Sequence, residues 1–398
     1  MEIKATQLLA AFLFSMLSMP AAHALEEKDC TEVRLDQGNG PFAKIPVYDQ
    51  RSLAEATDSE ICYAVEASQL IDARRFYQEG KLPRRLTAPL SLAAMAANAE
   101  MKLLSLDRME MPFAGPVKIF GMGNAMEAMR LAGKKPVCDQ NWLNQFDGSF
   151  GLTEQEQKQL LGENSDLRLY PSKRNFLQAI HAEIKKYQAV PLPFLAGILG
   201  GKADPDLSEE FFQCRTRENV IPAKDIIAAV KAASAMAMPV SSIGLFLEKF
   251  CSAHSFQPEI PEPQMANRMK LFPRNKENLT EYRVDELEKI AHEKLNRVPA
   301  QPIGVQYCGS VQEKIGAYEI GDDAGGLLNY SCPAHASVIV GRRFNPKSKS
   351  CDFLVRDSFG PSCHNAAGTP KYSWECENGQ FWIDSRQLMK STFQLNWL

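Results

Sequence analysis

The chain has 398 residues, which is enough for two or three packed units rather than one small module. Hydrophobic residues make up 45% of it and charged residues 23%, so the composition excludes a disordered, collagen-like or coiled-coil chain. The formal net charge of −3 gives no electrostatic basis for binding nucleic acid or an anionic membrane surface. We therefore expect a folded protein whose partner is not a nucleic acid.

The first apolar run lies at the extreme N-terminus and is typical of a signal peptide. Lys4 precedes an apolar stretch at 8–19, and Ala22-His23-Ala24 follows as a small-x-small cleavage pattern. No later stretch reaches the roughly 18 apolar residues that a membrane span requires. We expect residues 1–24 to be removed and the mature chain to be exported, periplasmic or secreted, and free of the membrane. An uncleaved anchor is the alternative.

Ten cysteines in an exported chain favour disulfide bonds over reduced thiols. None of them forms a Cys-x-x-Cys pair, so their spacing supports neither a structural zinc site nor a thioredoxin-like motif, and we expect no metal. If one cysteine stays free for chemistry, nine remain, which is an odd number. One further thiol is then left over, or a partner chain takes it, and our hypothesis is four disulfides and two thiols.

The first expected helix follows a polar stretch at 25–44. Asp58 and Ser59 are its candidate N-caps, and apolar residues recur at helical spacing from Ile61 to Ile71. Cys62 is expected in the first turn of this helix.

A mostly helical block is expected from about 152 to 256. It opens with a capping-box pattern, Thr153-x-x-Glu156, and continues in apolar-periodic runs. Four prolines between 258 and 273 indicate an irregular connector, and a further helix at about 284–295 is expected to be capped by Thr280.

From Pro302 onward the pattern changes from helix to strand. Short runs rich in β-branched and aromatic residues are bounded by Gly, Pro, Asn and Ser. The expected strands are 303–307, 336–340, 353–355 and 381–383. The whole chain is therefore expected to have an α+β fold, with a helical part first and a β-rich part last.

The second and third of these strands are expected to form a hairpin that turns at 345–347. His335 and Asp357 are equidistant from position 346, so we expect them to face each other on one side of the sheet. A carboxylate held against one imidazole nitrogen fixes the tautomer and frees the other nitrogen to act on a nucleophile. Cys62 is the candidate nucleophile, because a helix N-terminus stabilises a thiolate.

The segments around these residues resemble those of papain-like cysteine peptidases. Residues 46–50 (Pro-Val-Tyr-Asp-Gln) and 61–64 (Ile-Cys-Tyr-Ala) are similar to the signature in which Asp-Gln precedes Cys-Trp-Ala at the start of the central helix. Residues 334–341 resemble the histidine strand, 356–360 (Arg-Asp-Ser-Phe-Gly) the Asn-Ser-Trp-Gly box, and 374–383 the Trp and Gly-Tyr-x-Ile tail. The matches follow the chain order of that family.

The resemblance implies a papain-like two-lobe fold with a large helical insertion. Its expected parts are the signal peptide 1–24, an N-terminal extension 25–44, a helical lobe 45–149 with the catalytic cysteine, a helical insertion 150–282, and a β-rich lobe 283–398 with the catalytic histidine and aspartate. Cys62 lies 273 residues before His335, against about 130–150 in ordinary papain-like enzymes, and the insertion accounts for the excess.

The resemblance also assigns roles to further residues. Gln50 is expected to donate its side-chain amide to the oxyanion hole, together with the Cys62 backbone N–H, and Gly123 to pair its backbone with substrate. Cys363 and Cys376 flank an insertion relative to the tail of the family, and a disulfide between them would close that loop. No cofactor is needed for this chemistry.

The sequence thus predicts an exported cysteine peptidase that hydrolyses peptide bonds of peptide or protein substrates through Cys62, His335 and Asp357 and a thioester intermediate. Two alternatives stand beside it. One is an acyl-transfer enzyme, a transglutaminase or amidase, that uses the same triad. The other is a degenerate papain-like scaffold that binds a partner without catalysis.

Overall fold

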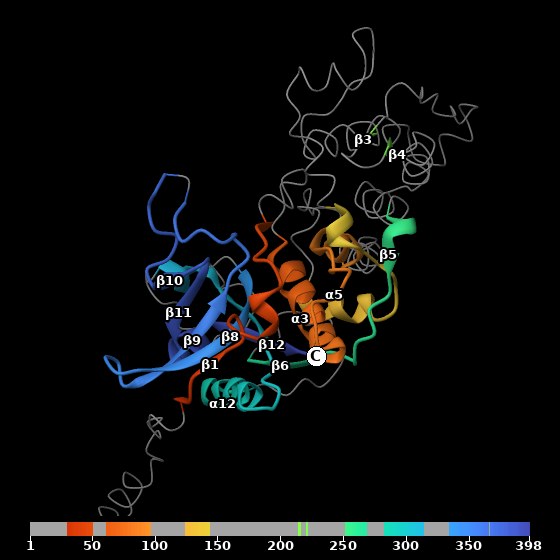
Figure 1. Cartoon of the computed structure of the whole chain (residues 1–398). Coiled ribbons are helices and arrows are strands. Elements are labelled where there is room, and N and C mark those ends of the chain that lie inside the picture. The colour runs from red at the N-terminus through yellow and green to blue at the C-terminus, as the bar shows by residue number, and fades with distance from the viewer. Residues whose placement is uncertain are drawn as a thin grey trace, which may run out of the picture.

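The computed structural model describes residues 30–50, 61–96, 124–143, 214–215, 220–221, 251–268, 282–313, 334–365 and 367–398. These residues combine helices with an antiparallel sheet, as expected for the α+β class (Figure 1). The predicted signal peptide, Gly123 and most of the predicted helical insertion lie outside the described residues.

An eight-stranded antiparallel sheet is the framework of the described part, in the order β10-β11-β9-β8-β7-β12-β6, with β1 also paired to β8. Its strands are β1 (Val33–Arg34), β6 (Gln264–Asn267), β7 (Ile303–Cys308), β8 (Ala334–Asn345), β9 (Ser350–Arg356), β10 (Glu375–Glu377), β11 (Gln380–Asp384) and β12 (Thr392–Trp397). All four expected strands are present, as parts of β7, β8, β9 and β11. The sequence analysis did not predict the other four strands of the sheet, β1, β6, β10 and β12, and β6 lies within the stretch interpreted as an irregular connector.

Two-stranded ladders and helices complete the described elements. The short strands are β2 (Val137–Cys138), paired with β5 (Ser255–Phe256), and β3 (Cys214–Arg215), paired with β4 (Val220–Ile221). The helices are α3 (Cys62–Glu79), α5 (Ala125–Ala132), α12 (Val284–Leu295) and α13 (Ser385–Lys390), with short 3-10 turns η2 (Pro41–Ala43), η4 (Ser252–His254) and η5 (Gly309–Glu313). Within the part of the chain that the structure describes, no helix combines the length and apolar character needed to cross a bilayer.

The predicted helix around Cys62 exists as α3, but it begins later than expected. Its N-cap is Ile61, which makes no side-chain cap, so the prediction of Asp58 or Ser59 as N-cap is wrong. The helix ends at Gly80, whose φ of 65° closes the last turn in the left-handed conformation. Cys62 is therefore the first residue of the helix.

The helix α3 is the buried centre of the fold. Its residues from Cys62 to Ala73 are all buried, and it packs against β7 and β8 of the sheet and against α5 (Figure 1). Ile61 and Leu70 belong to the same apolar cluster as Val305 and Ile339 of the sheet, all at most 2% exposed. Burial of this size is what holds a helix against a sheet, at about 1.5–3 kcal/mol per large apolar side chain.

The helix α12 begins two residues after Tyr282, and its N-cap differs from the predicted one. The Glu286 carboxylate accepts a hydrogen bond of 2.7 Å from the Arg283 backbone N–H, and Asp285 adds a second negative charge in the first turn. The predicted cap at Thr280 is therefore wrong, because Arg283 is the N-cap.

Disulfides join segments that are distant in sequence. Cys30 is bonded to Cys351 and Cys138 to Cys251, and the predicted bond between Cys363 and Cys376 is confirmed. Cys308 is also disulfide-bonded. Cys62 is a free, buried thiol.

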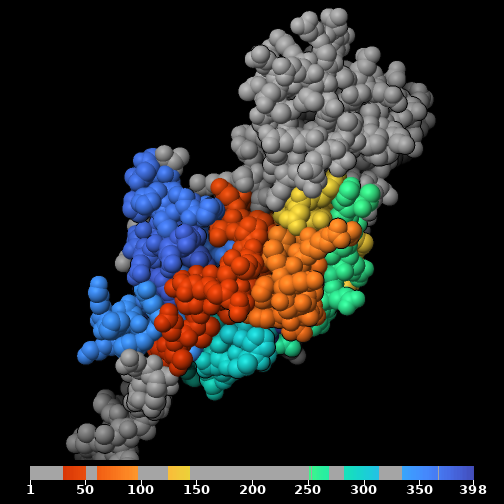
Figure 2. Space-filling model, in the orientation of Figure 1, coloured from red at the N-terminus to blue at the C-terminus, as the bar shows by residue number. Residues whose placement is uncertain are grey.

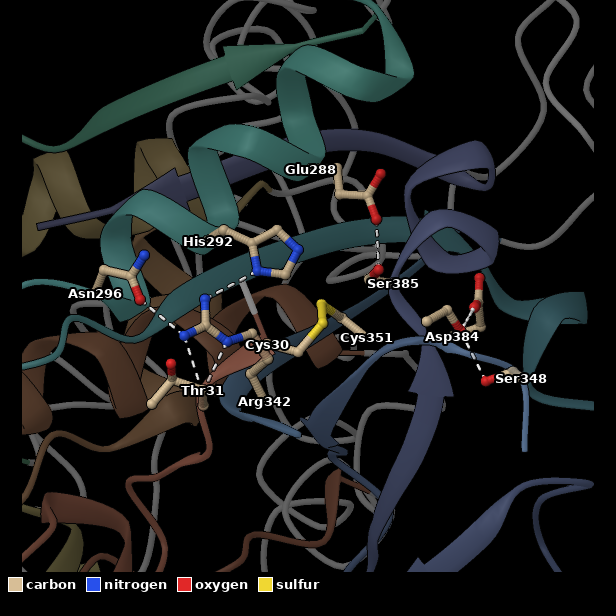
Figure 3. The surroundings of a disulfide bond; sticks show 11 residues. Cys30, Thr31, Glu288, His292, Asn296, Arg342, Ser348, Cys351, Asp384 and Ser385 are labelled. Carbon is tan, nitrogen blue, oxygen red and sulfur yellow. Dashed lines mark hydrogen bonds between the residues drawn. A yellow bond between two sulfur atoms is a disulfide. The ribbon is translucent and has the colours of Figure 1, made fainter. Parts of the chain in front are cut away.

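The N-terminal segment is part of this framework, because its strand β1 pairs with β8. Figure 2 shows residues 30–50 (red) on the surface between the C-terminal residues (blue) and residues 61–96 (orange). Beside the Cys30–Cys351 disulfide, the buried Arg342 guanidinium donates to the Thr31 carbonyl, to Asn296 Oδ1 at 2.7 Å and to His292 Nδ1 at 3.0 Å (Figure 3). The disulfide and this buried arginine together fix the start of the segment.

Candidate active site

The nucleophile candidate Cys62 lies at the N-terminus of α3 with 7% of its surface exposed. The first N–H groups of a helix have no partner within the helix, and with the helix dipole they favour a negative charge at this end. The Cys62 side chain is within hydrogen-bonding range of His335, which the packing of α3 on β8 brings to it. The structure thus joins two of the residues that the sequence singled out.

The third candidate, Asp357, lies directly after β9 and contacts His335. Its Oδ1 is 2.6 Å from His335 Nε2, and neither side chain is more than 7% exposed. Since Nε2 is engaged by the carboxylate, the other ring nitrogen, Nδ1, remains for the Cys62 thiol. Cysteine, imidazole and carboxylate therefore follow one another in a chain.

The predicted contact is present, but the predicted register is wrong. The turn spans 346–349, and a bulge at Val340 shifts the ladder so that Val338 pairs with Arg356. Continued by one residue, that register places Ser337 opposite Asp357 and makes His335 its diagonal neighbour. Diagonal neighbours on one face of a sheet still lie within reach of long side chains, and this explains the contact.

The Asp357 carboxylate is fully buried and accepts hydrogen bonds from several donors besides His335. Oδ1 accepts from the Ser358 backbone N–H at 2.7 Å and from Ser337 Oγ at 3.2 Å. Oδ2 accepts from Tyr372 Oη at 2.7 Å and from Gln312 Nε2 at 3.1 Å. A buried charge is stable only with such partners, so this shell is suited to an ionised carboxylate.

The electrostatics of the pair follow from this burial and these contacts. Burial disfavours the charged form of Asp357, but the positive charge of His335 and the hydrogen bonds outweigh it, so the pKa of Asp357 is lowered. Burial also disfavours a charged His335, yet the Asp357 carboxylate and the Cys62 side chain raise the pKa of His335 to about 10. The arrangement favours a charged imidazolium beside an ionised Asp357 carboxylate.

Aromatic rings enclose the His335 imidazole. Phe359 stacks on it with centroids 4.9 Å apart, and Tyr307 of β7 meets it edge-on at 5.6 Å. Tyr307 also exchanges a hydrogen bond of 3.0 Å with Ser337 Oγ. The rings leave His335 little freedom to rotate and keep water from its bond to Asp357.

The main chain of Gln50 is hydrogen-bonded to the segment that directly follows Asp357. Its backbone N–H donates to the Ser358 carbonyl at 2.7 Å, and the Gly360 N–H donates to the Tyr48 carbonyl at 3.0 Å. The side chain is buried at 2% exposure, and among the described residues its Oε1 has no hydrogen-bond partner and no hydrogen bond joins it to Cys62. The structure therefore brings Gln50 to the Asp357 segment, while residues 51–60 and Gly123 lie outside the described residues.

The sequence missed one ionisable group close to the triad, Glu66, one helical turn after Cys62. It is 1% exposed, and its Oε1 accepts from Asn396 Nδ2 of β12 at 2.8 Å. Burial raises the pKa of Glu66 to about 8, against the lowering influence of Asn396 and of the His335 charge. A charged residue in a buried helix turn is the signal that could have revealed it.

Ser337, Gln312 and Tyr372 were missed as well. Ser337 is two residues beyond His335 on the same face of β8, and the period of a strand could have indicated it. Gln312 and Tyr372 carry no local signal. No cluster of three or more His, Cys, Asp and Glu side chains suited to a metal ion occurs in the described ranges.

Comparisons with known proteins add a distant likeness. No family model matches the chain, and no curated protein is similar to it in sequence. Among solved structures, the chain is similar to the proform of Amb a 11, a cysteine protease and major ragweed pollen allergen, with a TM-score of 0.36 and 12% identity over 97% of this chain and 71% of that one. A likeness at this level does not place the chain in a family.

Proposed function

We propose that this protein is an exported, papain-like cysteine peptidase that hydrolyses peptide bonds through Cys62, His335 and Asp357. The observation that carries the proposal is the buried chain of contacts from the free Cys62 thiol to the imidazole and from the imidazole to the Asp357 carboxylate at 2.6 Å. The disulfides support an exported location, because such bonds persist in oxidising compartments.

In the proposed mechanism the Cys62 proton passes to His335 Nδ1, and the thiolate attacks the carbonyl carbon of the scissile bond. The charge that develops on the carbonyl oxygen is stabilised by the Cys62 backbone N–H at the helix N-terminus and by the Gln50 amide. The imidazolium then gives its proton to the leaving amine, and a thioester remains. A water molecule activated by His335 hydrolyses the thioester and restores the thiol.

Asp357 acts in this mechanism without exchanging a proton. It holds His335 in the tautomer that presents Nδ1 to the thiol, and its charge stabilises the imidazolium. Neutral asparagine could do the first but not the second. The carboxylate therefore supports a stable thiolate–imidazolium pair.

Purified mature chain, incubated with a peptide pool and analysed by mass spectrometry, tests the proposal. Cys62→Ala and His335→Ala should each lower hydrolysis by roughly 10³-fold or more in a chain that still folds, since nucleophile and base act as one unit. His254→Ala is the matched control, because this exposed histidine stacks on Trp142 and makes no contact with the triad among the described residues.

A peptidyl electrophile directed at thiols gives a second measurement on the same proteins. It should label the wild type and His254→Ala at Cys62, and leave Cys62→Ala unlabelled. Hydrolysis within tenfold of wild type in Cys62→Ala or His335→Ala would overturn the proposal. Transfer of the acyl group to an added primary amine, in place of hydrolysis, would identify an acyl-transfer enzyme instead.

A further inference from the structure

The Asp357 carboxylate divides its hydrogen bonds between its two oxygens. Oδ1 accepts hydrogen bonds from His335 Nε2, Ser337 Oγ and the Ser358 N–H. Oδ2 accepts hydrogen bonds from Tyr372 Oη and Gln312 Nε2. Donors on Oδ2 do not compete with the imidazole for an oxygen. They fix the plane of the carboxylate instead, and so the direction in which Oδ1 points.

Of these two donors, Tyr372 makes the shorter bond, at 2.7 Å against 3.1 Å for Gln312. Tyr372 is 5% exposed, and its ring stacks on Phe381 of β11 with centroids 4.8 Å apart. The hydroxyl is therefore presented to Asp357 by a ring that is itself fixed in the core. A hydrogen bond to a charged group is worth about 1.5–3 kcal/mol.

One disulfide and three hydrogen bonds hold the turn that carries Tyr372. The Cys363–Cys376 disulfide closes it, and the Lys371 N–H donates to the Cys363 carbonyl at 2.9 Å. Trp374 Nε1 donates to the Val311 carbonyl at 2.7 Å. The Ser373 backbone N–H donates to the Gln312 carbonyl at 3.0 Å. One disulfide-closed turn thus fixes both donors to Oδ2.

From this geometry we infer that Tyr372 is a positioning residue of the triad, which acts through Asp357 to hold His335 in the orientation needed for the reaction with Cys62. The inference deepens the proposed function and rests on it for its effect on catalysis. Tyr372 contacts Asp357 and Phe381 and acts on the reaction through Asp357, which makes it a positioning residue rather than a catalytic one.

Several titratable groups face His335 and bear on its protonation. They are Asp357 after β9, Cys62 and Glu66 on α3, and Tyr307 on β7. Burial raises the pKa of Tyr307 well above its usual range and raises that of Glu66 to about 8, and the Tyr372 variant retains both groups. A comparison of the wild type with a Tyr372 variant therefore isolates the coupling between Asp357 and His335.

The test replaces one buried hydroxyl at a time. Tyr372→Phe removes the donor to Oδ2 and keeps the ring, whereas Tyr48→Phe is a matched control: Tyr48 is also 5% exposed, and its hydroxyl has no hydrogen-bond partner among the described residues. We expect Tyr372→Phe to lower kcat by about tenfold with KM unchanged, and to move the alkaline limb of the pH–rate profile about one unit toward lower pH. Tyr48→Phe should follow the wild type.

A readout that needs no turnover separates this inference from the proposed function. In protein labelled with ¹⁵N-histidine, the His335 imidazole should titrate at lower pH in Tyr372→Phe than in wild type and Tyr48→Phe. The Cys363→Ser/Cys376→Ser double variant should shift it in the same direction, because it releases the turn. If the wild type hydrolyses no peptide but this shift occurs, the positioning role stands and the peptidase proposal fails. A Tyr372→Phe titration that coincides with wild type, or moves to higher pH, would overturn the positioning role.

Discussion

Glu66 and Gly304 share one space between α3 and β7. A Cβ atom on Gly304 would overlap the Glu66 carboxyl group, so the buried carboxyl occupies the place that a side chain at position 304 would need. The same carboxyl accepts a hydrogen bond from Asn396 of β12. The Glu66 side chain therefore connects the helix that carries Cys62 to two adjacent strands of the sheet, β7 and β12.

This relationship predicts a coupled effect of two substitutions. Gly304→Ala should lower the free energy of unfolding by about 1–3 kcal/mol, because the added methyl meets the Glu66 carboxyl in a packed core. In a Glu66→Ala background, where that group is absent, the same substitution should be nearly neutral. Urea denaturation of the two single variants and the double variant measures the coupling. Additive losses would show that the two residues do not share the space.

The raised pKa of Glu66 predicts how stability depends on pH. The carboxyl is neutral in the folded state up to about pH 8 but ionises near pH 4.5 in the unfolded chain, so the unfolded state binds fewer protons between these values. The free energy of unfolding should then fall as pH rises through this window, by up to about 1.4 kcal/mol per pH unit. Asp72, whose pKa burial raises to about 7, adds a similar fall over a lower range.

Glu66→Gln should remove the contribution of Glu66 and leave that of Asp72. The amide keeps an acceptor for Asn396 and cannot ionise, so the free energy of unfolding should decrease less steeply between about pH 5 and pH 8. Denaturation curves at a series of pH values give the two slopes. Equal slopes in the wild type and the variant would mean that Glu66 is ionised in the folded protein at neutral pH.

Asp357 is predicted to set the alkaline limit of activity. Because its charge helps raise the pKa of His335 to about 10, Asp357→Asn should lower that pKa and shift the alkaline limb of kcat/KM to lower pH. Much of the rate at mildly acidic pH should remain, since the amide oxygen can still accept from His335. Asp357→Ala should be less active than Asp357→Asn at every pH. An unshifted limb in the asparagine variant would remove Asp357 from the triad.

The disulfides are predicted to contribute unequally to stability. Cys30 and Cys351 are 321 positions apart and Cys363 and Cys376 are 13 apart, so the first bond restricts the unfolded chain more. Serine replacement of both cysteines should lower the free energy of unfolding by about 5 kcal/mol for the first pair and about 3 kcal/mol for the second. Urea denaturation without reductant compares them. A larger loss for the second pair would contradict this order.

The sequence predicted the elements whose pattern is local. Strands β7, β8, β9 and β11 are rich in β-branched and aromatic residues between turn-forming residues, and that composition fits a pleated, buried surface. The strand β12, Thr-Phe-Gln-Leu-Asn-Trp, was missed although it alternates polar and apolar residues. Both of its faces are buried, because Asn396 on the polar face meets Glu66.

The sequence predicted the part of the site that lies on one pair of neighbouring strands. It did not predict the contacts between segments that are distant in the sequence. His335 and Asp357 lie at the same end of one hairpin, so even a register wrong by two residues left them in contact. Tyr372, in the disulfide-closed turn, also contacts the Asp357 carboxylate. No fixed sequence spacing between Tyr372 and Asp357 indicates this contact. The start of α3 at Cys62 was missed for another reason, since its N-cap Ile61 carries none of the polar side chains that mark helix starts.

The Cys138–Cys251 disulfide has a consequence for how this chain can change length. Its two Cα atoms are 5.5 Å apart although 113 positions separate them, and β2 and β5 pair beside the bond. Positions 138 and 251 therefore lie next to each other in the described framework, although they are far apart in the sequence. The entropy of closing a loop between two such positions grows only with the logarithm of the loop's length, so we expect the framework to tolerate changes in the length of the sequence between them. A chain shortened there by a brief linker should keep the sheet, α3 and the His335–Asp357 contact.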